Sequence, residues 1–222
     1  MNTKDIITED MVKPLLDKKF IRVFDLQYEE GKHYFDATRR TKEELVATKP
    51  EDDFNSLMPD AVSCIVILHI KDKEPVLLLS YEYRYPVGHY LLGVPAGLID
   101  PADKLCKNRD EAIIKTATRE LFEETGIKVT DKDSVKICNP CLFSTPGMTD
   151  ECNALAVCNI YLNDTSALTQ EGAEGSEKFS GFWLLTKEDA RNVLNKGTDE
   201  YNHAYSIYTF AALMYFLYST TV

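Results

Sequence analysis

Three glutamates within five positions, Glu120, Glu123 and Glu124, are the residues of this sequence best suited to chemistry. On a helix, residues three and four positions apart are surface neighbours, so the three carboxylates would lie on one side. Like charges at that spacing repel, and a divalent cation would relieve the repulsion. Carboxylate oxygens on one rigid face suit Mg²⁺, or Mn²⁺, which shares its remaining positions with water and substrate phosphates. The stretch therefore predicts a metal site that acts on a phosphate compound.

A helix must position these carboxylates, and the sequence predicts one from about Arg109 to Thr125. Asn108, with Glu111 three residues later, resembles a capping box, and Gly126 could end the helix in a left-handed conformation. Beside the acidic face, apolar residues recur at helical spacing at Ile114, Ala117 and Leu121. The alternative is an ordinary acidic amphipathic helix, which so many fixed residue types at fixed spacing disfavour.

The composition bounds the class of protein. The chain has 222 residues, 44% hydrophobic and 27% charged, which are values of a globular protein. That length allows one large domain, or one domain with a small appendage. The net charge of −11 argues against a nucleic-acid surface, which normally carries a basic stripe. It also makes a phosphate substrate awkward without a metal or local arginines.

The cysteines and the apolar runs favour a cytosolic protein. There are six cysteines, and the single Cys138-x-x-Cys141 pair has no second pair to complete a metal site, so we expect reduced thiols. The first ten residues are polar and acidic, so we expect no signal peptide. The most apolar run, Ala204 to Tyr218, is shorter than the ~20 residues of a membrane span and predicts a buried helix. We therefore expect no membrane contact.

The N-terminal residues predict a small β unit, from residue 1 to about 55, joined to a larger domain over residues 56–222. Residues 1–18 allow a possible first helix. Phe20 to Leu26 alternates as a half-buried strand does, Glu30 to Lys32 is a turn, and His33 to Arg39 returns as the second arm of a hairpin. Residues 42–53 are charged and predict a linker or an exposed edge.

The larger domain alternates between apolar strand patterns and helical ones. The predicted strands are Ala61–Ile70, Val76–Tyr81, Val135–Leu142, Asn153–Leu162 and Phe179–Leu185. The predicted helices, besides the acidic one, are Lys187–Leu194 and Ser206–Tyr218. Residues 144–151 form a loop between two of the strands. This order predicts an α/β fold, a mixed sheet between helices in an α/β/α sandwich.

The acidic stretch resembles the signature of the Nudix hydrolases. Glu111 is followed by seven residues and then by Arg119-Glu120-Leu121-x-Glu123-Glu124-x-Gly126-Ile127, a full match over the helical half. The loop half departs from the family, because Gly97 lies eight residues further from Glu111 than usual. Residues within Pro101 to Arg109 therefore look like an insertion. The resemblance implies the same sandwich fold.

Flanking stretches are similar to one branch of that family, the ADP-ribose (ADP-sugar) pyrophosphatases. They are Tyr83-Arg84-Tyr85-Pro86, Pro95-Ala96-Gly97-Leu98-Ile99-Asp100, Thr145 to Glu151, and the hairpin that ends in Arg39-Arg40. One departure is Gly93, where the branch usually has Glu. In this branch the N-terminal β unit helps to build a homodimer, and the adenine pocket can include the partner chain. The resemblance therefore implies a homodimer.

The resemblance also implies roles for individual residues. Glu120 and Glu124 would ligate Mg²⁺ together with the backbone carbonyl of Ala96, and Glu123 would complete the site. Arg119, which cannot lose its charge, would orient these carboxylates. The branch supplies a general base from a loop before a late strand, where Glu177 is the better match and Glu174 the second; a solvated acidic loop is the alternative.

The same motifs contain the expected substrate contacts. Arg39 and Arg84 would bind phosphate oxygens, because guanidinium forks match them. Tyr34 could stack on adenine, although a core aromatic is an equal interpretation. Leu98 and Glu151 lie in two of the matching motifs and complete the set.

The sequence thus favours a cytosolic, Mg²⁺-dependent pyrophosphatase that cleaves ADP-ribose, a nucleoside diphosphate sugar, to AMP and ribose 5-phosphate. Within enzymes, the alternative is a Nudix hydrolase of another ADP-sugar or of a dinucleotide. Outside enzymes, the alternative is a Nudix domain that binds ADP-ribose as a sensor. We would expect a sensor to lose glutamates from the helix or to carry an added DNA-binding domain. This sequence keeps all three glutamates, and we expect no further domain after Val222.

Overall fold

A computed structural model of the protein describes residues 7–172, 175 and 177–219. Its contacts divide the chain into two compact units. The first unit consists of Met1–Asp60 with Cys141–Asn153, and the second of Ala61–Pro140 with Ala154–Val222. Each unit contains its own β-sheet.

The first unit is built on a three-stranded antiparallel sheet, in the order β1 (Val12–Asp17), β2 (Arg22–Glu29), β3 (Lys32–Thr38). The predicted hairpin of β2 and β3 is confirmed, and Gly31 takes the left-handed conformation of its turn at φ 72°. The helix expected before residue 18 is wrong, because a short 3-10 turn, η1 (Glu9–Met11), leads into β1. Pro14, which lacks an amide hydrogen, suits this outer strand, and the register of β1 shifts just after it.

The segment that follows the hairpin is buried at its centre and exposed on either side. It folds into two 3-10 turns, η2 (Lys42–Glu44) and η3 (Val46–Thr48), and a short helix, α1 (Glu51–Asn55). Leu45 is fully buried in the core of the first unit. Its neighbours there are Val12, Phe24 and Leu26. The expectation of a linker or exposed edge over residues 42–53 is therefore wrong at its centre.

The second unit contains the three longer helices of the described residues and the remaining strands, except for the end of β8 and the start of β9, which fall within the first unit. The strands are β4 (Ala61–Ile70), β5 (Val76–Arg84), β6 (His89–Gly93), β7 (Ala96–Leu98), β8 (Ser134–Phe143), β9 (Cys152–Leu162) and β10 (Phe179–Leu185). The helices are α2 (Arg109–Thr125), α3 (Lys187–Lys196) and α4 (Ile207–Tyr218). Every strand and helix predicted for this region is confirmed, within one to three residues at each end. The short strands β6 and β7 were expected only as the approach to the loop.

The central strand of this sheet is β4, nine of whose ten residues are buried. The strand order is β10-β5-β4-β9-β8, with β6 added to β5 and β7 added to β4. β4 runs antiparallel to β5 and β7. It runs in the same direction as β9, because the chain before β4 bonds to the start of β9 (Asp60 N to Cys152 O, 2.8 Å) and the chain after it to the end (Lys71 N to Leu162 O, 2.9 Å). The sheet is therefore mixed, as predicted.

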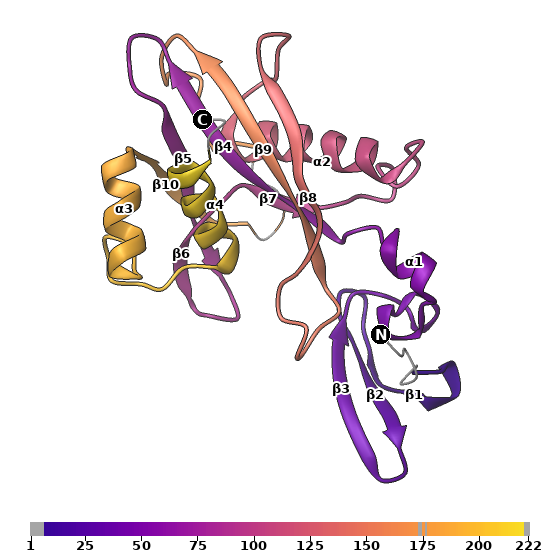
Figure 1. Ribbon diagram of the computed structural model, residues 1–222. Helices are drawn as coiled ribbons and strands as arrows, with labels where there is room; N and C mark the ends of the chain where they lie inside the picture. The colour runs from indigo at the N-terminus through magenta and orange to yellow at the C-terminus, as the bar shows by residue number, and fades with distance from the viewer. Residues whose placement is uncertain (1–6, 173–174, 176, 220–222) are drawn as a thin grey trace. The chain divides into compact units, whose positions relative to one another are not determined.

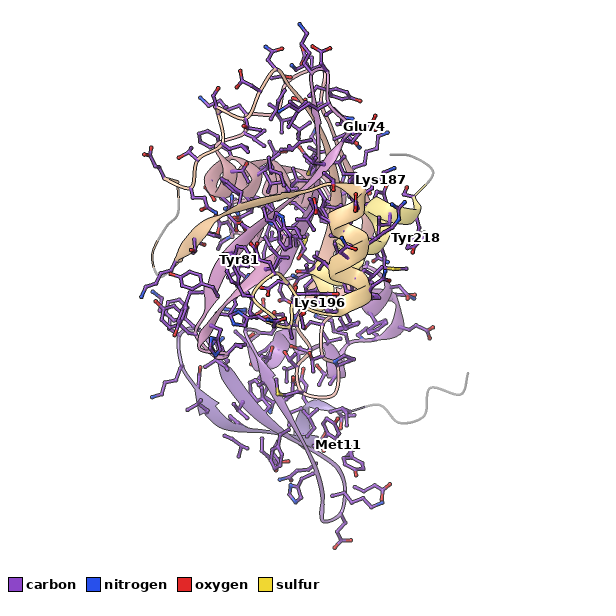
Figure 2. All side chains as sticks on the ribbon, turned by 90° about the vertical axis from the view of Figure 1, so that its left-hand side faces the viewer. Met11, Glu74, Tyr81, Lys187, Lys196 and Tyr218 are labelled. Carbon is purple, nitrogen blue, oxygen red and sulfur yellow. The ribbon has the colours of Figure 1, made fainter. Side chains whose placement is uncertain are left out.

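Helices cover both faces of this sheet. α2 contacts β4 and β7, whereas α4 contacts β4, β5 and β6 and packs against α3. Figure 1 shows α2 partly hidden behind β8 and β9, with α4 in front of the sheet. Figure 2 labels the two ends of α3, Lys187 and Lys196, beside α4. The α/β/α sandwich expected from the sequence is confirmed.

Two further findings concern the cysteines and the possibility of membrane-spanning helices. All six cysteines are free thiols, and three of them, Cys64, Cys152 and Cys158, are buried. Within residues 7–172, 175 and 177–219, no helix is both long enough and apolar enough to cross a membrane.

Candidate active site

Helix α2 carries the acidic residues, and its ends are closed by the predicted residues. The Asn108 side chain accepts the amide hydrogen of Glu111 at 2.9 Å, and Gly126 ends the helix at φ 74°. The Glu111 carboxylate accepts from the amide of Lys107 at 3.0 Å, one residue before the position that a reciprocal capping box requires. Glu111 therefore contributes to the start of the helix rather than to the acidic centre.

Two of the three glutamates lie on the buried face of α2. Glu120 is 5% exposed and Glu124 is 3% exposed, beside the fully buried Ala117 and Leu121. The side chain of Glu123 is 32% exposed and lies at the rim. The sequence predicted an acidic side next to a separate packing side, whereas the structure brings two carboxylates into the contact between helix and sheet. Their charges are therefore costly unless something compensates them.

Glu124 contacts the strand that precedes the helix. Its Oε1 accepts the amide hydrogen of Ala96 at 3.2 Å, while its Oε2 is buried and has no hydrogen-bond partner among the residues that the structure describes. Burial raises the pKa of Glu124 to about 9. The Ala96 amide opposes this rise, and the charges of Glu82, Glu120 and Glu177 add to it. Glu124 is thus a carboxyl that binds a proton near neutral pH when no cation is present.

Glu120 lies directly against Gly97 of β7. A Cβ atom added to Gly97 would overlap the Glu120 carboxyl group, so glycine is required for this approach. Burial raises the pKa of Glu120 to about 7, and the adjacent Arg119 opposes the rise. The Ala96-Gly97 strand and helix α2 therefore hold two acidic side chains at one place.

Arg119 links Glu120 and Glu123 to the end of β7. Its Nη1 donates to Glu120 at 2.7 Å and to Glu123 at 2.9 Å. Its Nη2 donates to the carbonyl oxygen of Leu98 at 2.9 Å. Burial opposes the charge of Arg119, but the nearby carboxylates, Glu120 first, raise its pKa further above the ordinary value. The guanidinium fork thereby fixes both carboxylates relative to the end of β7.

The insertion after Gly97 is tied to α2 by Asp103, a residue that the sequence did not single out. Asp103 is 3% exposed and lies 3.0 Å from Lys115 Nζ. It also accepts from Thr116 Oγ1 at 3.2 Å and from Arg119 at 3.4 Å. Burial raises its pKa, but these three donors outweigh it, so the pKa is lowered. A single Asp in a long loop forms no sequence pattern that would predict this role.

Strand β5 adds Glu82, which the sequence also missed, and Arg84. Glu82 Oε2 lies 2.5 Å from Nη2 of Arg84. Burial raises the pKa of Glu82, Arg84 opposes the rise, and Glu177 adds to it. The signal was present in the alternation of Tyr81-Glu82-Tyr83-Arg84, which places the two charged side chains on one face of the strand.

Of the two candidate bases, Glu177 is described and Glu174 lies outside the described residues. Glu177 is exposed and stands two residues before β10. Its charge raises the pKa of three carboxyls, those of Glu82, Glu120 and Glu124. Glu177 therefore lies within electrostatic reach of the acidic pair.

The other expected substrate contacts divide between the two units. Leu98 belongs to the second unit, where its side chain is exposed and its carbonyl accepts from Arg119. Tyr34, Arg39 and Glu151 belong to the first unit. There, Arg39 Nε lies 2.9 Å from Glu151 Oε2, and Tyr34 donates its hydroxyl hydrogen to the Gly147 carbonyl at 2.9 Å.

The donor set fits a divalent cation, although the side chains are arranged for hydrogen bonds. In the described part of the chain, no three Asp, Glu, His or Cys side chains converge closely enough to hold an ion. Arg119 and the Ala96 amide engage the oxygens of Glu120 and Glu124 instead. A hard cation would bind the buried Oε2 of Glu124 and would lower the raised pKa values of Glu120 and Glu124.

Comparison with known proteins identifies the class. Residues 58–204 match the NUDIX domain, which is more than half of the chain, so this protein belongs to the Nudix family of hydrolases. Members of the family generally use divalent metal ions.

Individual relatives are similar over part of their length. The chain is 30% identical over 130 residues to an ADP-sugar pyrophosphatase of Mus musculus, covering 59% of this chain and 54% of that protein. It is 36% identical over 94 residues to an ADP-ribose pyrophosphatase of Saccharomyces cerevisiae, covering 41% and 35%. The matches thus span about half, or less, of these relatives.

A solved structure agrees over nearly the whole fold. The crystal structure of an ADP compounds hydrolase superposes with a TM-score of 0.53 and covers 91% of this chain and 88% of its own. At 20% identity, this likeness concerns the fold.

Proposed function

We propose that this chain is a Mg²⁺-dependent pyrophosphatase that hydrolyses ADP-ribose to AMP and ribose 5-phosphate. The observation that carries the proposal is the buried acidic pair, Glu120 and Glu124, held against the Ala96-Gly97 strand. The names of the mouse and yeast relatives support an ADP-linked sugar as the class of substrate.

Four groups would hold the metal: the carboxylates of Glu120, Glu123 and Glu124, and the carbonyl of Ala96. Bound there, Mg²⁺ would supply charge stabilisation at the phosphate oxygens and lower the pKa of water. Arg119 keeps Glu120 and Glu123 oriented through hydrogen bonds of 2.7 and 2.9 Å. It also opposes the protonation of Glu120.

Glu177 is the proposed general base. Its carboxylate takes a proton from the attacking water, whose oxygen bonds to phosphorus while the bridging P–O bond breaks. AMP and ribose 5-phosphate leave as the products. Glu174 is the second candidate for this role. The electrostatic influence of Glu177 on Glu120 and Glu124 supports its assignment.

Arg84 and Arg39 are the proposed anion contacts, with Leu98, Tyr34 and Glu151 as further substrate contacts. Each arginine is already paired with a carboxylate, Arg84 with Glu82 and Arg39 with Glu151. A phosphate group would have to compete for these guanidinium groups or share them. A doubly charged diphosphate is suited to that competition.

We also propose a cytosolic homodimer that binds neither nucleic acid nor membrane. Six free thiols support a reducing compartment, and the net charge of −11 opposes binding to nucleic acid. The first unit exposes an unusual number of large apolar side chains, which supports its role as the contact between subunits. They include Leu15, Leu16, Phe20, Ile21, Tyr28 and Phe35.

A second candidate substrate is another ADP-sugar. The mouse relative is named for ADP-sugars in general. Gly93 stands where the resembled branch carries Glu, so this chain has no carboxylate at that position. A different sugar would suit a site that lacks this polar contact.

The proposal is tested by incubating the protein with Mg²⁺ and a panel of ADP-ribose, other ADP-sugars and dinucleotides. The products are then separated by chromatography. AMP and ribose 5-phosphate from ADP-ribose are the expected products. Faster cleavage of a different ADP-sugar would favour the second candidate, and tight binding of ADP-ribose without turnover would contradict hydrolysis.

A further inference from the structure

Lys178, the neighbour of the proposed base, is held by strand β5 in two ways. Its carbonyl oxygen accepts the amide hydrogen of Tyr83 at 2.8 Å. Its ammonium nitrogen lies 5.5 Å from the ring centroid of Tyr85 and 5.8 Å from that of Tyr83. Both distances fall within the range of cation–π attraction. The two rings meet edge to face at 5.1 Å, so they form a joint surface for one cation.

This attachment of Lys178 lies at the point where β10 begins to pair with β5. Phe179 is the Cα partner of Glu82, and the Tyr83–Lys178 hydrogen bond extends the ladder by one residue. The ladder is then irregular up to Phe182, around Gly181 at φ 95°. The start of β10 is therefore anchored mainly through residues 178 and 179.

Successive side chains of an extended segment point to opposite faces. Tyr83 is thus on one face of β5, and Glu82 and Arg84 are on the other, while Tyr85, in the turn after β5, packs edge to face on Tyr83. Lys178 lies on the face of Tyr83, and an extended continuation of the ladder to residue 177 would turn Glu177 toward the face of Glu82. The electrostatic effect of Glu177 on Glu82 agrees with this placement.

Glu177 belongs to an exposed segment, so its position depends on how that segment is attached to the sheet. Three other acidic groups, Glu82, Glu120 and Glu124, lie within its electrostatic reach. An attachment on the opposite face can hold Glu177 near these charges without neutralising it.

We propose that Lys178, clamped by the rings of Tyr83 and Tyr85, is a positioning residue that holds Glu177 over the acidic pair. This inference rests on the proposed function, in which Glu177 is the general base. The contact depends on the positive charge of Lys178 and on the ring faces of Tyr83 and Tyr85. Arg can therefore replace Lys178, and Phe can replace Tyr85.

The test measures two quantities, the turnover of ADP-ribose with Mg²⁺ and the hydrogen exchange of the Tyr83 amide, which reports whether the Lys178 carbonyl stays bonded. Lys178→Met and Tyr85→Leu remove the clamp. Lys178→Arg and Tyr85→Phe preserve it. Lys187→Met is the matched control, because Lys187 lies 5.9 Å from the ring centroid of Phe216, away from the acidic pair.

Lys178→Met and Tyr85→Leu are expected to lower kcat roughly three- to tenfold with little change in KM, and to speed exchange of the Tyr83 amide by a similar factor. Lys178→Arg, Tyr85→Phe and Lys187→Met should behave as the wild type does. Wild-type turnover that persists unchanged in Lys178→Met and Tyr85→Leu would overturn the clamp and leave the proposed function standing. Absence of turnover in the wild type would overturn both.

Discussion

The amide of Ala96 donates to Glu124 Oε1 at 3.2 Å, while the second oxygen of the same carboxylate is buried with no hydrogen-bond partner in the described part of the chain. One side of this carboxyl group is thus fixed by the strand and the other is left without compensation. A buried charge in this position is costly by itself and becomes favourable when a cation binds. The predictions below depend on this imbalance.

The stability of the metal-free protein should fall as pH rises from 6 to 9. The pKa of Glu120 is raised to about 7 and that of Glu124 to about 9, so the folded state binds these protons more tightly than the unfolded chain does. The resulting stability is present at low pH and is lost as pH rises through these values. We expect a loss of about 2–4 kcal/mol in the free energy of unfolding, measured by urea denaturation with chelator.

Saturating Mg²⁺ should remove most of that loss, because the cation compensates the ionised carboxylates. The Glu124→Gln protein is the control and should show a flatter pH dependence without metal. A wild-type stability that rises between pH 6 and 9 would contradict the raised pKa values.

Gly97→Ala should impair the enzyme more than it destabilises it. The added methyl group would displace the flexible end of Glu120, which can swing aside at little cost in folding free energy. We expect kcat to fall about tenfold or more, with a shift of Tm of only a few degrees. Gly93→Ala is the matched control, because its Cβ would meet only Ser80 O at 3.9 Å. Equal kinetics in the two variants would contradict the contact between Gly97 and Glu120.

Arg119→Lys should lower activity even though the charge is kept. The guanidinium group bonds two carboxylates through Nη1 and the Leu98 carbonyl through Nη2, which a single ammonium cannot reproduce. We expect kcat/KM to fall about 10- to 100-fold. Arg191→Lys, at an exposed position of α3, should match the wild type. Steady-state kinetics of the two variants decide this point, and wild-type activity in Arg119→Lys would count against the fork.

Asp36→Asn should stabilise the first unit at alkaline pH. Burial, and then the charge of Asp150, raise the pKa of Asp36 to about 6, so its contribution to stability declines as pH rises from about 4 to 6. Asn can still accept the Asp150 amide hydrogen, which Asp36 Oδ1 accepts at 3.0 Å. We expect a gain of about 1–3 kcal/mol at pH 8 and less at pH 5, measured by denaturant unfolding. A destabilised variant at pH 8 would refute the raised pKa.

Much of the fold could be predicted because its local signals agree with its long-range contacts. The apolar run of β4 predicts a strand from local sequence alone. The capping residues Asn108 and Gly126 likewise predict the ends of α2. β1 was missed because Val12 is its only buried residue, and its place depends on pairing with β2. Leu45 was missed because one apolar side chain within a charged segment gives no periodic pattern.

The candidate site could be predicted in its residue types but not in its surroundings. The spacing of Glu120 and Glu124 indicated a shared face, whereas their burial depends on how closely Gly97 approaches α2. Asp103 is a single acid whose partners lie on α2, so spacing alone could not single it out, whereas Glu82 pairs with Arg84 on its own strand. The assignment of Glu177 as the base stays a prediction.

The most direct measurement compares wild type and Glu124→Gln for turnover of ADP-ribose with Mg²⁺ and for thermal unfolding without metal. The wild type should release AMP and ribose 5-phosphate. Glu124→Gln should lose at least about 100-fold in kcat while its metal-free Tm is equal or higher, because the substitution removes a buried ionisable group and keeps an acceptor for the Ala96 amide. A well-folded Glu124→Gln protein with wild-type turnover would show that the acidic pair is not the catalytic centre.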